Sequence, residues 1–595
     1  MSPVRRRTAG SLPSLSRFAA IHDALRRTRR RHRHRRRQRK LHSPAKIHMW
    51  WPKASSTETN GATWERGEGT QNMRQELGLE ELPEDILHHI HFLMPIQDAA
   101  RAACVSRGFL HSWRHYSNLI LSDRTLGLLG RTFEETKTHL TYKVDKILTN
   151  HYHNGVKVKT LKLSLGPCKD IKASYLDRWL RIIKPGIQEF SLVLSSVMNK
   201  SYSFPCSVLS NEAAASSIQS LSLLGCAFHP TSILGCLRRL KCLSLCYVHV
   251  TEDGLAHLLS KSSVLEWLEI EACSGIVCLK IPCTLQQLKF LSVQKCKMVQ
   301  LVEIDAPQLC SFHYGGIPDA DHYGRTPAIY VQNSSHLKTV DISPVSLSGI
   351  LSYARFSLPS IAQNVESLTL HGRSENANIP MLPSKLPHVK NLEISLLKPF
   401  FSPNYDVLSL VSFLDASPAL ESFILRVSHY VHPSQLSMLL LMYNYTLLSE
   451  EYYLSLHMYL QVEQHAIIHD PVVGDDTEYR RQNLECRNNS LRKVLITGFC
   501  SAKSMVGLTV HILERTHSLE RFTLDTTYGY DRRTCNIGKF PTARMICQCW
   551  SLSKRGLEEA HRAVETADRY IKGRVPSSVQ FEVLGPVVDV ILGSR

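Results

Sequence analysis

The side chains best able to bind a metal or attack a substrate in this sequence are its 29 histidines and 17 cysteines. Three histidines stand together in "HHIH", as His88, His89 and His91. On a helix, side chains share a face only when they are three or four residues apart, so these three cannot jointly hold one ion. We therefore expect exposed or interfacial histidines here, without a metal.

The cysteines fall into two groups. One group follows the leucine of a recurring apolar pattern by five residues: Cys226, Cys273 and Cys296. That regular place predicts a structural role, in which each cysteine satisfies backbone groups at a turn. The second group is Cys236, Cys242 and Cys246, for which zinc binding is an alternative. The strand period already accounts for the positions of Cys242 and Cys246.

Sequence motifs for catalysis are missing. The chain contains no G-x-x-x-x-G-K-[ST], H-E-x-x-H, G-x-S-x-G or G-x-G-x-x-G. These motifs bind phosphates, hold a catalytic zinc, present a nucleophilic serine and bind dinucleotides, respectively. We therefore expect a non-catalytic protein without cofactor or metal.

Most of the net charge of +19 lies near the start of the chain. Residues 1–60 carry 17 Lys+Arg against 2 Asp+Glu, a balance of +15, which leaves +4 for the rest. The stretch "RRTRRRHRHRRRQRK" (26–40) has no apolar residue, so we expect a disordered tail over residues 1–76. It is typical of nuclear import or non-specific polyanion binding; a transit peptide or a non-essential extension are the alternatives. The remainder gives no sign of nucleic-acid binding.

No run of 18 apolar residues occurs in the sequence. The first apolar stretch is too short for a secretory signal and is followed by arginines. We expect no membrane segment, a place in the nucleus and/or cytoplasm, and cysteines that remain thiols.

A small helical unit follows the tail. Leu82, Ile86, Leu87, Ile90 and Leu93 lie on one face of a helix, which Pro95 should end. Asp98 can cap a second helix, Gly108 can end it, and "FLHSWRHY" (109–116) predicts a third. So small a unit cannot bury all of this apolar surface by itself, so part of it must meet another element or protein.

The rest of the chain is a repeat array. An apolar pair at alternate positions, preceded by another apolar residue, recurs along the chain, at intervals of 21 to 31 residues from Leu221 to Phe423. The first members of these pairs are Leu161, Phe190, Leu221, Leu243, Leu268, Leu291, Phe312, Val340, Leu368, Leu392, Phe423, Val494 and Phe522. The pattern predicts a leucine-rich-repeat solenoid with a parallel stacked sheet, and hence an α/β fold.

The residue after each of these positions should point outward, onto a concave face where solenoids commonly bind partners. Those we expect to meet a target are Ser222, Ser244, Glu269, Ser292, Asp341, Thr369 and Glu393. This row is mixed polar and shows no aromatic or basic stripe, which argues against a nucleic-acid track.

Two segments depart from the repeats. Residues 428–460 have neither repeat spacing nor loop composition; they predict either a target-binding insertion or an alternatively retained segment. Leu557 to Lys572 predicts a final helix, and Val579, Phe581 and Val583 alternate as in a strand. This helix and strand would cap the open end of the array.

The order L-P-E-D-I-L, proline, Asp98, "CVSR" and an aromatic residue resembles an F-box, the module that docks on the Skp-type adaptor of cullin-RING ubiquitin ligases. The resemblance departs at Phe109, where many F-boxes have tryptophan; here Trp113 follows four residues later. By position, the resemblance implies adaptor contacts at Leu82, Pro83, Ile86, Leu87, Ile90, Leu93, Pro95, Ala102, Val105 and Phe109.

Together with the irregular repeats and the "EAHRAV" helix, the chain resembles plant, especially grass, F-box proteins with leucine-rich repeats. The implied organisation is a tail (1–76), an F-box (77–125), a solenoid (126–556) and a cap (557–595). The implied function is target recognition in an SCF-type ubiquitin ligase, with a cullin bound through the adaptor and an unknown protein as target. The alternatives are a non-catalytic scaffold whose helical unit merely caps the array, and a nucleic-acid-associated protein that uses its tail.

Overall fold

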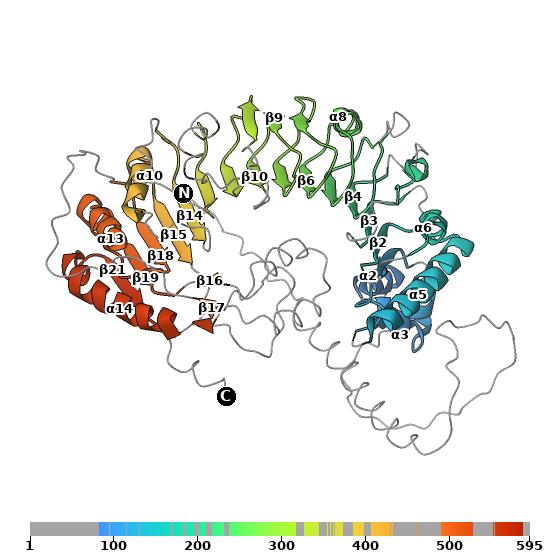
Figure 1. The fold of residues 1–595 in the computed structure, drawn as a ribbon. Coiled ribbons are helices and arrows are strands. Elements are labelled where there is room, and N and C mark those ends of the chain that lie inside the picture. Colours follow the sequence, from blue (N-terminus) through green and yellow to red (C-terminus); the bar gives the residue numbers. More distant parts are fainter. Residues whose placement is uncertain are drawn as a thin grey trace, which may run out of the picture. The chain divides into compact units, whose positions relative to one another are not determined.

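The fold is that of a computed structural model (Figure 1). None of the helices in the part it describes is long and apolar enough to cross a membrane. The described residues are 83–94, 96–114, 116–129, 131–166, 168, 171–182, 186–195, 202–209, 217–230, 237–316, 327–343, 351, 354, 358, 361, 363–372, 385–397, 406–428, 430–431, 463–464, 489–527, 551–552 and 554–586. The predicted tail lies outside them, as do Leu82, Pro95 and Cys236.

Three short helices form the first described unit: α2 (Glu84–Leu93), α3 (Ile96–Ala103) and α4 (Arg107–Arg114). Pro83 precedes α2 in an extended conformation, and the acidic Glu84 and Asp85 occupy the first turn, where the helix dipole favours negative charge. Three helices were predicted here, and three are present. Two local predictions are wrong. Asp98 lies inside the first turn of α3, where its carboxylate accepts a 2.8 Å hydrogen bond from Arg101, and Gly108 lies inside α4.

The position of Gly108 is explained by the packing of α4 against α2. A methyl group on Gly108 would lie 3.1 Å from Cδ1 of Leu87, so the glycine lets α4 approach α2 closely. The glycine at this position therefore marks a close contact between two helices and not the end of a helix.

A parallel sheet of 15 strands follows, in the order β1-β2-β3-β4-β5-β6-β8-β10-β12-β13-β14-β15-β18-β19-β21. Every strand predicted from the repeat pattern is present, and the register aligns the predicted apolar positions across the sheet, as for Leu243, Leu268 and Leu291. The bounds are β1 Asn118–Leu121, β2 Thr160–Ser164, β3 Glu189–Val193, β4 Ser220–Leu224, β5 Cys242–Cys246, β6 Trp267–Glu271, β8 Phe290–Gln294, β10 Ser311–Gly315, β12 Thr339–Ser343, β13 Ser367–Gly372, β14 Asn391–Leu397, β15 Ser422–Ser428, β18 Lys493–Thr497, β19 Arg521–Asp525 and β21 Gln580–Leu584.

The strands end in a repeated turn. The residue directly after the strand has a positive φ angle at Gly225, Tyr247, Ala272, Lys295 and Gly498. A left-handed backbone conformation is costly for residues other than glycine. Three non-glycine residues adopt it at this turn, so the stacked repeats impose the turn.

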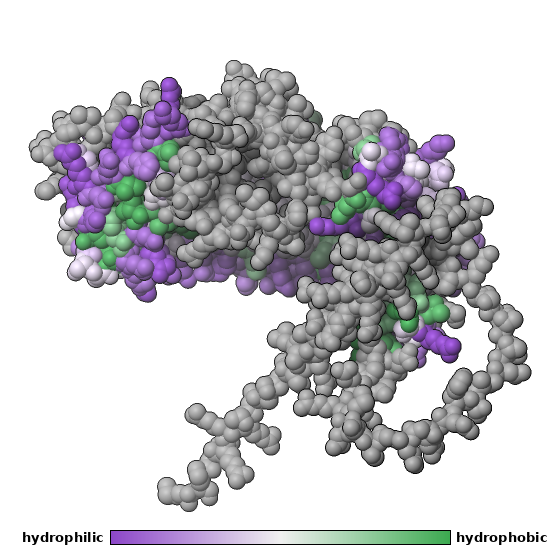
Figure 2. Space-filling view, turned by 90° about the horizontal axis from the view of Figure 1, so that it is seen from below, coloured by the Kyte–Doolittle hydropathy of each residue, from purple (hydrophilic) through white to green (hydrophobic). Residues whose placement is uncertain are grey.

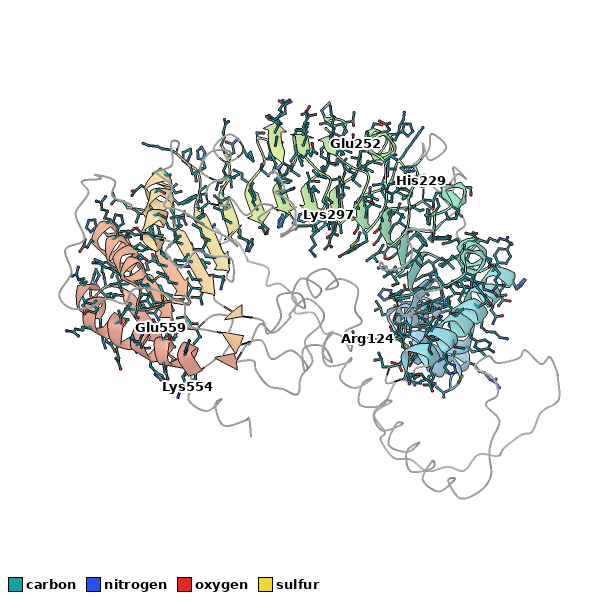
Figure 3. All side chains as sticks on the ribbon, viewed as in Figure 1. Arg124, His229, Glu252, Lys297, Lys554 and Glu559 are labelled. Atoms are coloured by element: carbon teal, nitrogen blue, oxygen red, sulfur yellow. The ribbon has the colours of Figure 1, made fainter. Side chains whose placement is uncertain are left out.

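The segments between strands carry helices or a second, three-stranded parallel sheet. That sheet is formed by β7 (Cys278–Ile281), β9 (Leu301–Asp305) and β11 (Ala328–Gln332), and Figure 1 shows α8 and β9 on the same side of the main sheet. Glu252, labelled in Figure 3, ties α8 to β7, because its Oε1 accepts a 2.7 Å bond from the backbone N–H of Cys278. The helical elements are α5 Phe133–His153, α6 Ala173–Leu180, η2 Cys206–Leu209, α8 Glu252–Ser260, η4 Val407–Leu410, α10 Val411–Ala416, α13 Lys503–Arg515, α14 Lys554–Tyr570 and η5 Lys572–Arg574.

The C-terminal end of the sheet is formed by α14 and β21. The helix begins at Lys554, three residues before the predicted start, and β21 pairs in parallel with β19, so that Phe581 lies opposite Phe522. The carboxylate of Glu559 on α14 (Figure 3) is buried and accepts bonds from the backbone N–H (2.8 Å) and hydroxyl (2.7 Å) of Ser501. These bonds join the last helix to the connection between β18 and α13.

The predicted insertion at 428–460 lies mostly outside the described residues. Only its first residue, Ser428, and β16 (Tyr430–Val431) are described, and β16 pairs with β17 (Glu463–Gln464), which in turn pairs with β20 (Ser551–Leu552).

Candidate functional site

The helical unit has a core of its own. Leu87, Ala102 and Phe109 are 7%, 8% and 6% exposed and pack together, with Ile90 and Met94 partly buried against them. We expected the first three to contact a partner. The structure corrects that assignment: they hold α2, α3 and α4 together, because a side chain buried in its own domain leaves little surface for another protein.

A second set of apolar residues, on α2 and in the turn between α3 and α4, is exposed. Ile86, Leu93 and Val105 are 43%, 62% and 76% exposed, and Pro83 is exposed at the start of α2. Ile86, Ile90 and Leu93 are spaced i, i+4 and i+7, so they form one stripe along α2. Figure 2 shows apolar (green) surface beside hydrophilic (purple) surface in the described parts of the molecule. The helical periodicity found these residues but did not separate the exposed stripe from the core.

His91 organises the inside of the unit, although we expected an exposed or interfacial histidine. It is 1% exposed, its Nε2 donates to the carbonyl of Ala99 (2.9 Å), and its Nδ1 accepts from the hydroxyl of Ser112 (2.9 Å). Its ring packs against Phe109 and Trp113, with centroid separations of 5.3 Å and 5.9 Å. Burial lowers the pKa of His91, although the bond to Ala99 opposes that shift. The neutral imidazole therefore links all three helices.

Tyr116 completes this cluster. Its hydroxyl donates to the carbonyl of Met94 (2.9 Å), at the end of α2, and its ring stacks on Trp113 with centroids 5.3 Å apart. Burial raises the pKa of Tyr116 to about 12, so the phenol stays protonated and keeps its bond.

On the main sheet, the predicted target-facing residues form a single row. Strand register places them side by side across β4, β5, β6, β8, β12, β13 and β14: Ser222, Ser244, Glu269, Ser292, Asp341, Thr369 and Glu393. His313 of β10, which we did not predict, fills the gap in the row between Ser292 and Asp341. Ser292 is 5% exposed, so it contributes little surface. We call the side of the sheet that carries this row the outward face.

The outward face also carries aromatic side chains, contrary to our expectation. Trp267 and Phe290 lie one residue before the buried strand leucine and point to the same side as the row. Their rings stack with centroids 3.5 Å apart, and Phe290 meets His313 at 4.9 Å. Trp267 remains 42% exposed. Three neighbouring strands, β6, β8 and β10, therefore present a continuous aromatic patch of Trp267, Phe290 and His313.

Polar contacts fix the surroundings of this patch. Asp341 lies between two histidines, 3.6 Å from Nδ1 of His313 and 3.4 Å from Nε2 of His371. Further along the face, Glu393 pairs with Arg426 at 2.6 Å. A target that binds here would meet side chains already held in place, which lowers the entropy cost of binding.

Ser311, His313 and Asp341 have the order of a hydrolase triad, since the Ser311 hydroxyl lies 2.9 Å from Nε2 of His313. The distance from Nδ1 to Asp341, 3.6 Å, is too long for a hydrogen bond. Strand β10 is also hydrogen-bonded to β8 and β12 on either side, which occupies the backbone N–H groups that could stabilise an oxyanion. This arrangement supports a binding surface better than a catalytic one.

A row of alternating charges runs along the start of the strands. Glu366 lies between Lys338 (2.6 Å) and Lys390 (3.0 Å), which lower its pKa to about 2. Glu266 likewise lies between two lysines, at 3.3 Å and 2.8 Å. Because lysine and glutamate alternate, this edge is balanced in charge and offers no basic track for a polyanion.

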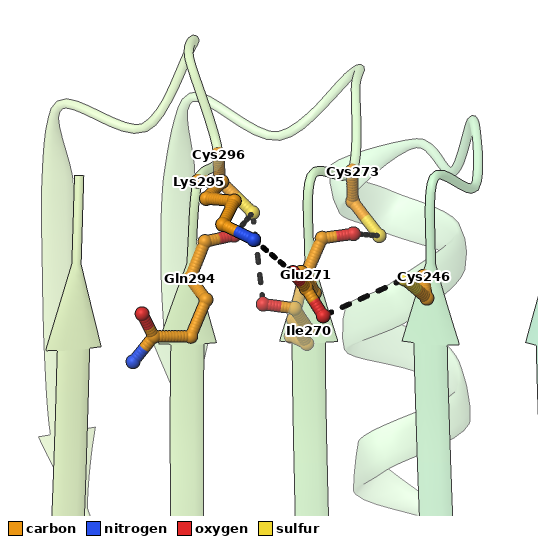
Figure 4. Close-up of polar contacts among 7 residues, drawn as sticks. All are labelled: Cys246, Ile270, Glu271, Cys273, Gln294, Lys295 and Cys296. Atoms are coloured by element: carbon orange, nitrogen blue, oxygen red, sulfur yellow. Dashed lines mark hydrogen bonds and ion pairs between the residues drawn. The ribbon is translucent and has the colours of Figure 1, made fainter. Parts of the chain in front are cut away.

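The predicted structural role of the cysteines is confirmed for Cys273 and Cys296. The thiol of Cys273 donates to the carbonyl of Leu245 (3.3 Å), and that of Cys296 donates to the carbonyl of Ile270 (3.8 Å; Figure 4), each in the preceding repeat. Burial raises the pKa of both thiols, so they stay protonated. Cys226 is also buried.

The alternative zinc site does not fit the described part of its ligand set. Cys242 and Cys246 lie on the same face of β5 but at its two ends, about 13 Å apart along the strand. Zinc-bound sulfurs lie within a few ångströms of each other, so these two cannot share an ion.

Comparison with known proteins agrees with this architecture. The family described as "At1g61320/AtMIF1, LRR domain" matches residues 147–440 and 430–587, and the F-box domain matches residues 79–121. The F-box/LRR-repeat protein At5g02910 of Arabidopsis thaliana is 24% identical over 303 residues, which are 49% of this chain and 60% of that relative. The chain thus spans about 60% of the length of this curated relative.

A solved structure of a leucine-rich-repeat protein from Leptospira interrogans is also similar, at 11% identity and a TM-score of 0.23, and the match covers 73% of this chain and 98% of that one. The F-box match coincides with α2, α3 and α4, and the repeat match takes in the main sheet from β2 to β21. The chain belongs to the At1g61320/AtMIF1 leucine-rich-repeat family and is a plant F-box/LRR protein.

Proposed function

We propose that this chain is the target-recognition subunit of an SCF-type, cullin-RING ubiquitin ligase. In this role the F-box binds a Skp-type adaptor, and through it a cullin, while the repeats hold a target protein. Catalysis would come from proximity to the ubiquitin-loaded enzyme, so the chain itself would need no catalytic residue.

The observation that carries the proposal is the exposed stripe on α2. The F-box already has a buried core, yet Leu93 and Val105 are 62% and 76% exposed. A small domain that keeps large apolar side chains in water on the outside of a complete core is typical of a docking surface. We propose that Ile86, Ile90, Leu93 and Val105 contact the adaptor, with Pro83 beside them.

For the target, we propose the outward face, centred on the aromatic patch. Exposed aromatic side chains are the residues that most often contribute the bulk of binding energy at protein interfaces. Trp267 offers such an anchor, and Glu269 and Asp341 offer polar groups on the neighbouring row. Target binding at this patch would be independent of the F-box stripe.

The experiment is reconstitution. The full chain would be co-expressed with a Skp-type adaptor and a cullin, as wild type and as Ile86→Ser/Leu93→Ser. Met298→Ser is the matched control, because Met298 is 52% exposed but lies in the repeats. We expect wild type and control to co-purify with both partners and the double variant to lose them. Wild type that binds a target but retains neither the adaptor nor the cullin would instead favour the alternative, a leucine-rich-repeat scaffold outside ubiquitin ligases.

We also propose that the protein acts in the nucleus and/or cytoplasm, with the arginine-rich stretch as an import signal. Deleting residues 26–40 from a fluorescently tagged chain should then reduce its nuclear fraction. Salt-sensitive polyanion binding that disappears with residues 1–60 would favour the nucleic-acid alternative for the tail.

A further inference from the structure

Two helices of the F-box bring three metal-binding side chains together. Glu84 and His88 come from successive turns of α2, and His111 comes from α4. One carboxylate oxygen of Glu84, Oε1, lies 3.4 Å from Nε2 of His88 and 2.9 Å from Nε2 of His111. All three ligand atoms lie within 4.8 Å of one another.

Two of these three separations are close to those in a zinc centre, and the third, between the two imidazole nitrogens, is at most 4.8 Å. Zinc binds imidazole nitrogen and carboxylate oxygen at about 2.0–2.1 Å in a tetrahedron, so two ligand atoms on one ion lie about 3.3 Å apart. The two distances to Glu84 are on either side of that value. Two histidines and one glutamate are also a donor set that zinc accepts, and a water molecule can take the fourth position on an exposed surface.

The backbone explains why the three side chains meet. Glu84 and His88 are four residues apart and therefore share one face of α2. The close approach of α4 at Gly108, 3.1 Å from Leu87 if it carried a methyl group, brings His111 to that face one turn later. The rings of His88 and His111 stand edge to face with centroids 6.2 Å apart.

We propose that Glu84, His88 and His111 form a surface zinc site that links α2 to α4. The three ligand atoms converge from two helices, so that one divalent cation could be bound by all three groups. By joining two helices, a bound ion stabilises the folded F-box by an amount that grows with the logarithm of the zinc concentration above the dissociation constant.

The site leaves the docking stripe open. With 3.6 residues per turn, His88 lies about 160° around the helix axis from Ile86, and Glu84 about 180° from Leu93. Zinc and a protein bound at the stripe would therefore occupy opposite flanks of α2. The inference does not depend on the proposed ligase role.

The test is zinc binding by the full chain, freed of metal by a chelator and titrated with zinc chloride against a chromophoric zinc indicator. Residues 1–60 contain further histidines, a side chain that can bind zinc, so the informative quantity is the difference between variants. We expect His88→Gln/His111→Gln to bind one equivalent less than wild type, and His111→Gln alone to weaken that equivalent at least about tenfold. His89→Gln, an exposed histidine on the same helix outside the set, is the control and should bind as wild type does.

Cobalt(II) gives a second readout. A tetrahedral cobalt centre absorbs visible light, and that absorption should appear in wild type and His89→Gln but not in the double variant. The substituted side chains are partly or fully exposed, so circular dichroism should be unchanged. Equal zinc stoichiometry in wild type and double variant, or an equal loss in His89→Gln, would overturn the proposal.

Discussion

Trp267 lies flat on Phe290 of the neighbouring strand, with ring centroids 3.5 Å apart and ring planes 13° from parallel. The stack holds a large, rigid and still 42% exposed side chain at the centre of the outward face. An aromatic side chain that is already immobilised loses little entropy when a partner covers it, so this position suits a binding anchor.

Replacing that anchor should weaken target binding selectively. Trp267→Ala should lower the affinity for a target by about 2 kcal/mol, or roughly 30-fold, because it removes the largest exposed ring of the patch. The measurement is quantitative capture of cross-linked partners by the full chain. Tyr330→Ala is the control, since Tyr330 is 57% exposed on β11 of the second sheet. Equal losses in both variants would refute a specific role for the aromatic patch.

His91 should be essential to the folded F-box. His91→Ala removes a buried ring and leaves the Ala99 carbonyl and the Ser112 hydroxyl without that partner, at a cost of roughly 2–4 kcal/mol. Amide hydrogen exchange across α2 and α4 should accelerate, while exchange in the repeats should not. His89→Ala changes an exposed neighbour and should leave protection in α2 unchanged; if it has as large an effect, the buried network is not the cause.

The F-box should also lose stability in mild acid. The pKa of His91 is lowered in the folded state, mainly by burial, so below pH 6.5 the unfolded chain binds a proton that the folded chain does not. Stability is therefore full above about pH 6.5 and falls as the pH drops below it, by up to roughly 1.4 kcal/mol per pH unit. Hydrogen exchange in α2, corrected for its intrinsic pH dependence, would show this between pH 7.5 and 5.5. His91→Gln should flatten the dependence, and an unchanged slope would assign it to other groups.

The C-terminal cap depends on one buried carboxylate. Glu559→Leu removes the acceptor for both the N–H and the hydroxyl of Ser501 and should destabilise the contact of α14 with the connection between β18 and α13 by roughly 1–3 kcal/mol. Faster hydrogen exchange in α13 and α14 is the expected result. Glu558→Leu, at the exposed neighbouring position, should be close to neutral, and equal effects of the two substitutions would contradict the role of this bond.

The repeats were predictable because a period of two in apolar residues is a local signal. Leu243 and Leu245 point inward, and every pair that we predicted lies in a strand of the main sheet. The same signal was present in β7 and β9, at Leu279/Ile281 and Val302/Ile304, but these strands lie between consecutive pairs of the main repeat series and were missed. The alternation of side chains along a strand would also have placed Trp267 on the outward face, since it directly precedes a buried strand leucine.

The split of the F-box into core and surface could not be read from the sequence. Helical spacing gave one broad apolar face on α2, and which flank is buried depends on where α3 and α4 pack. Leu87 turned inward and Leu93 outward for that reason. His91 and His111 likewise acquired their roles only through residues on other helices, so no spacing within α2 could reveal them.

The most direct test of the whole account is the dissociation constant between a purified Skp-type adaptor and the full chain. Leu93→Ser removes an exposed side chain from the docking stripe without touching the core, so the F-box should stay folded while adaptor affinity falls by roughly 10- to 100-fold. Met298→Ser should bind as wild type does. If Leu93→Ser binds the adaptor with unchanged affinity, or if wild type does not bind it, the stripe on α2 is not an adaptor-docking surface and the chain is better described as a scaffold.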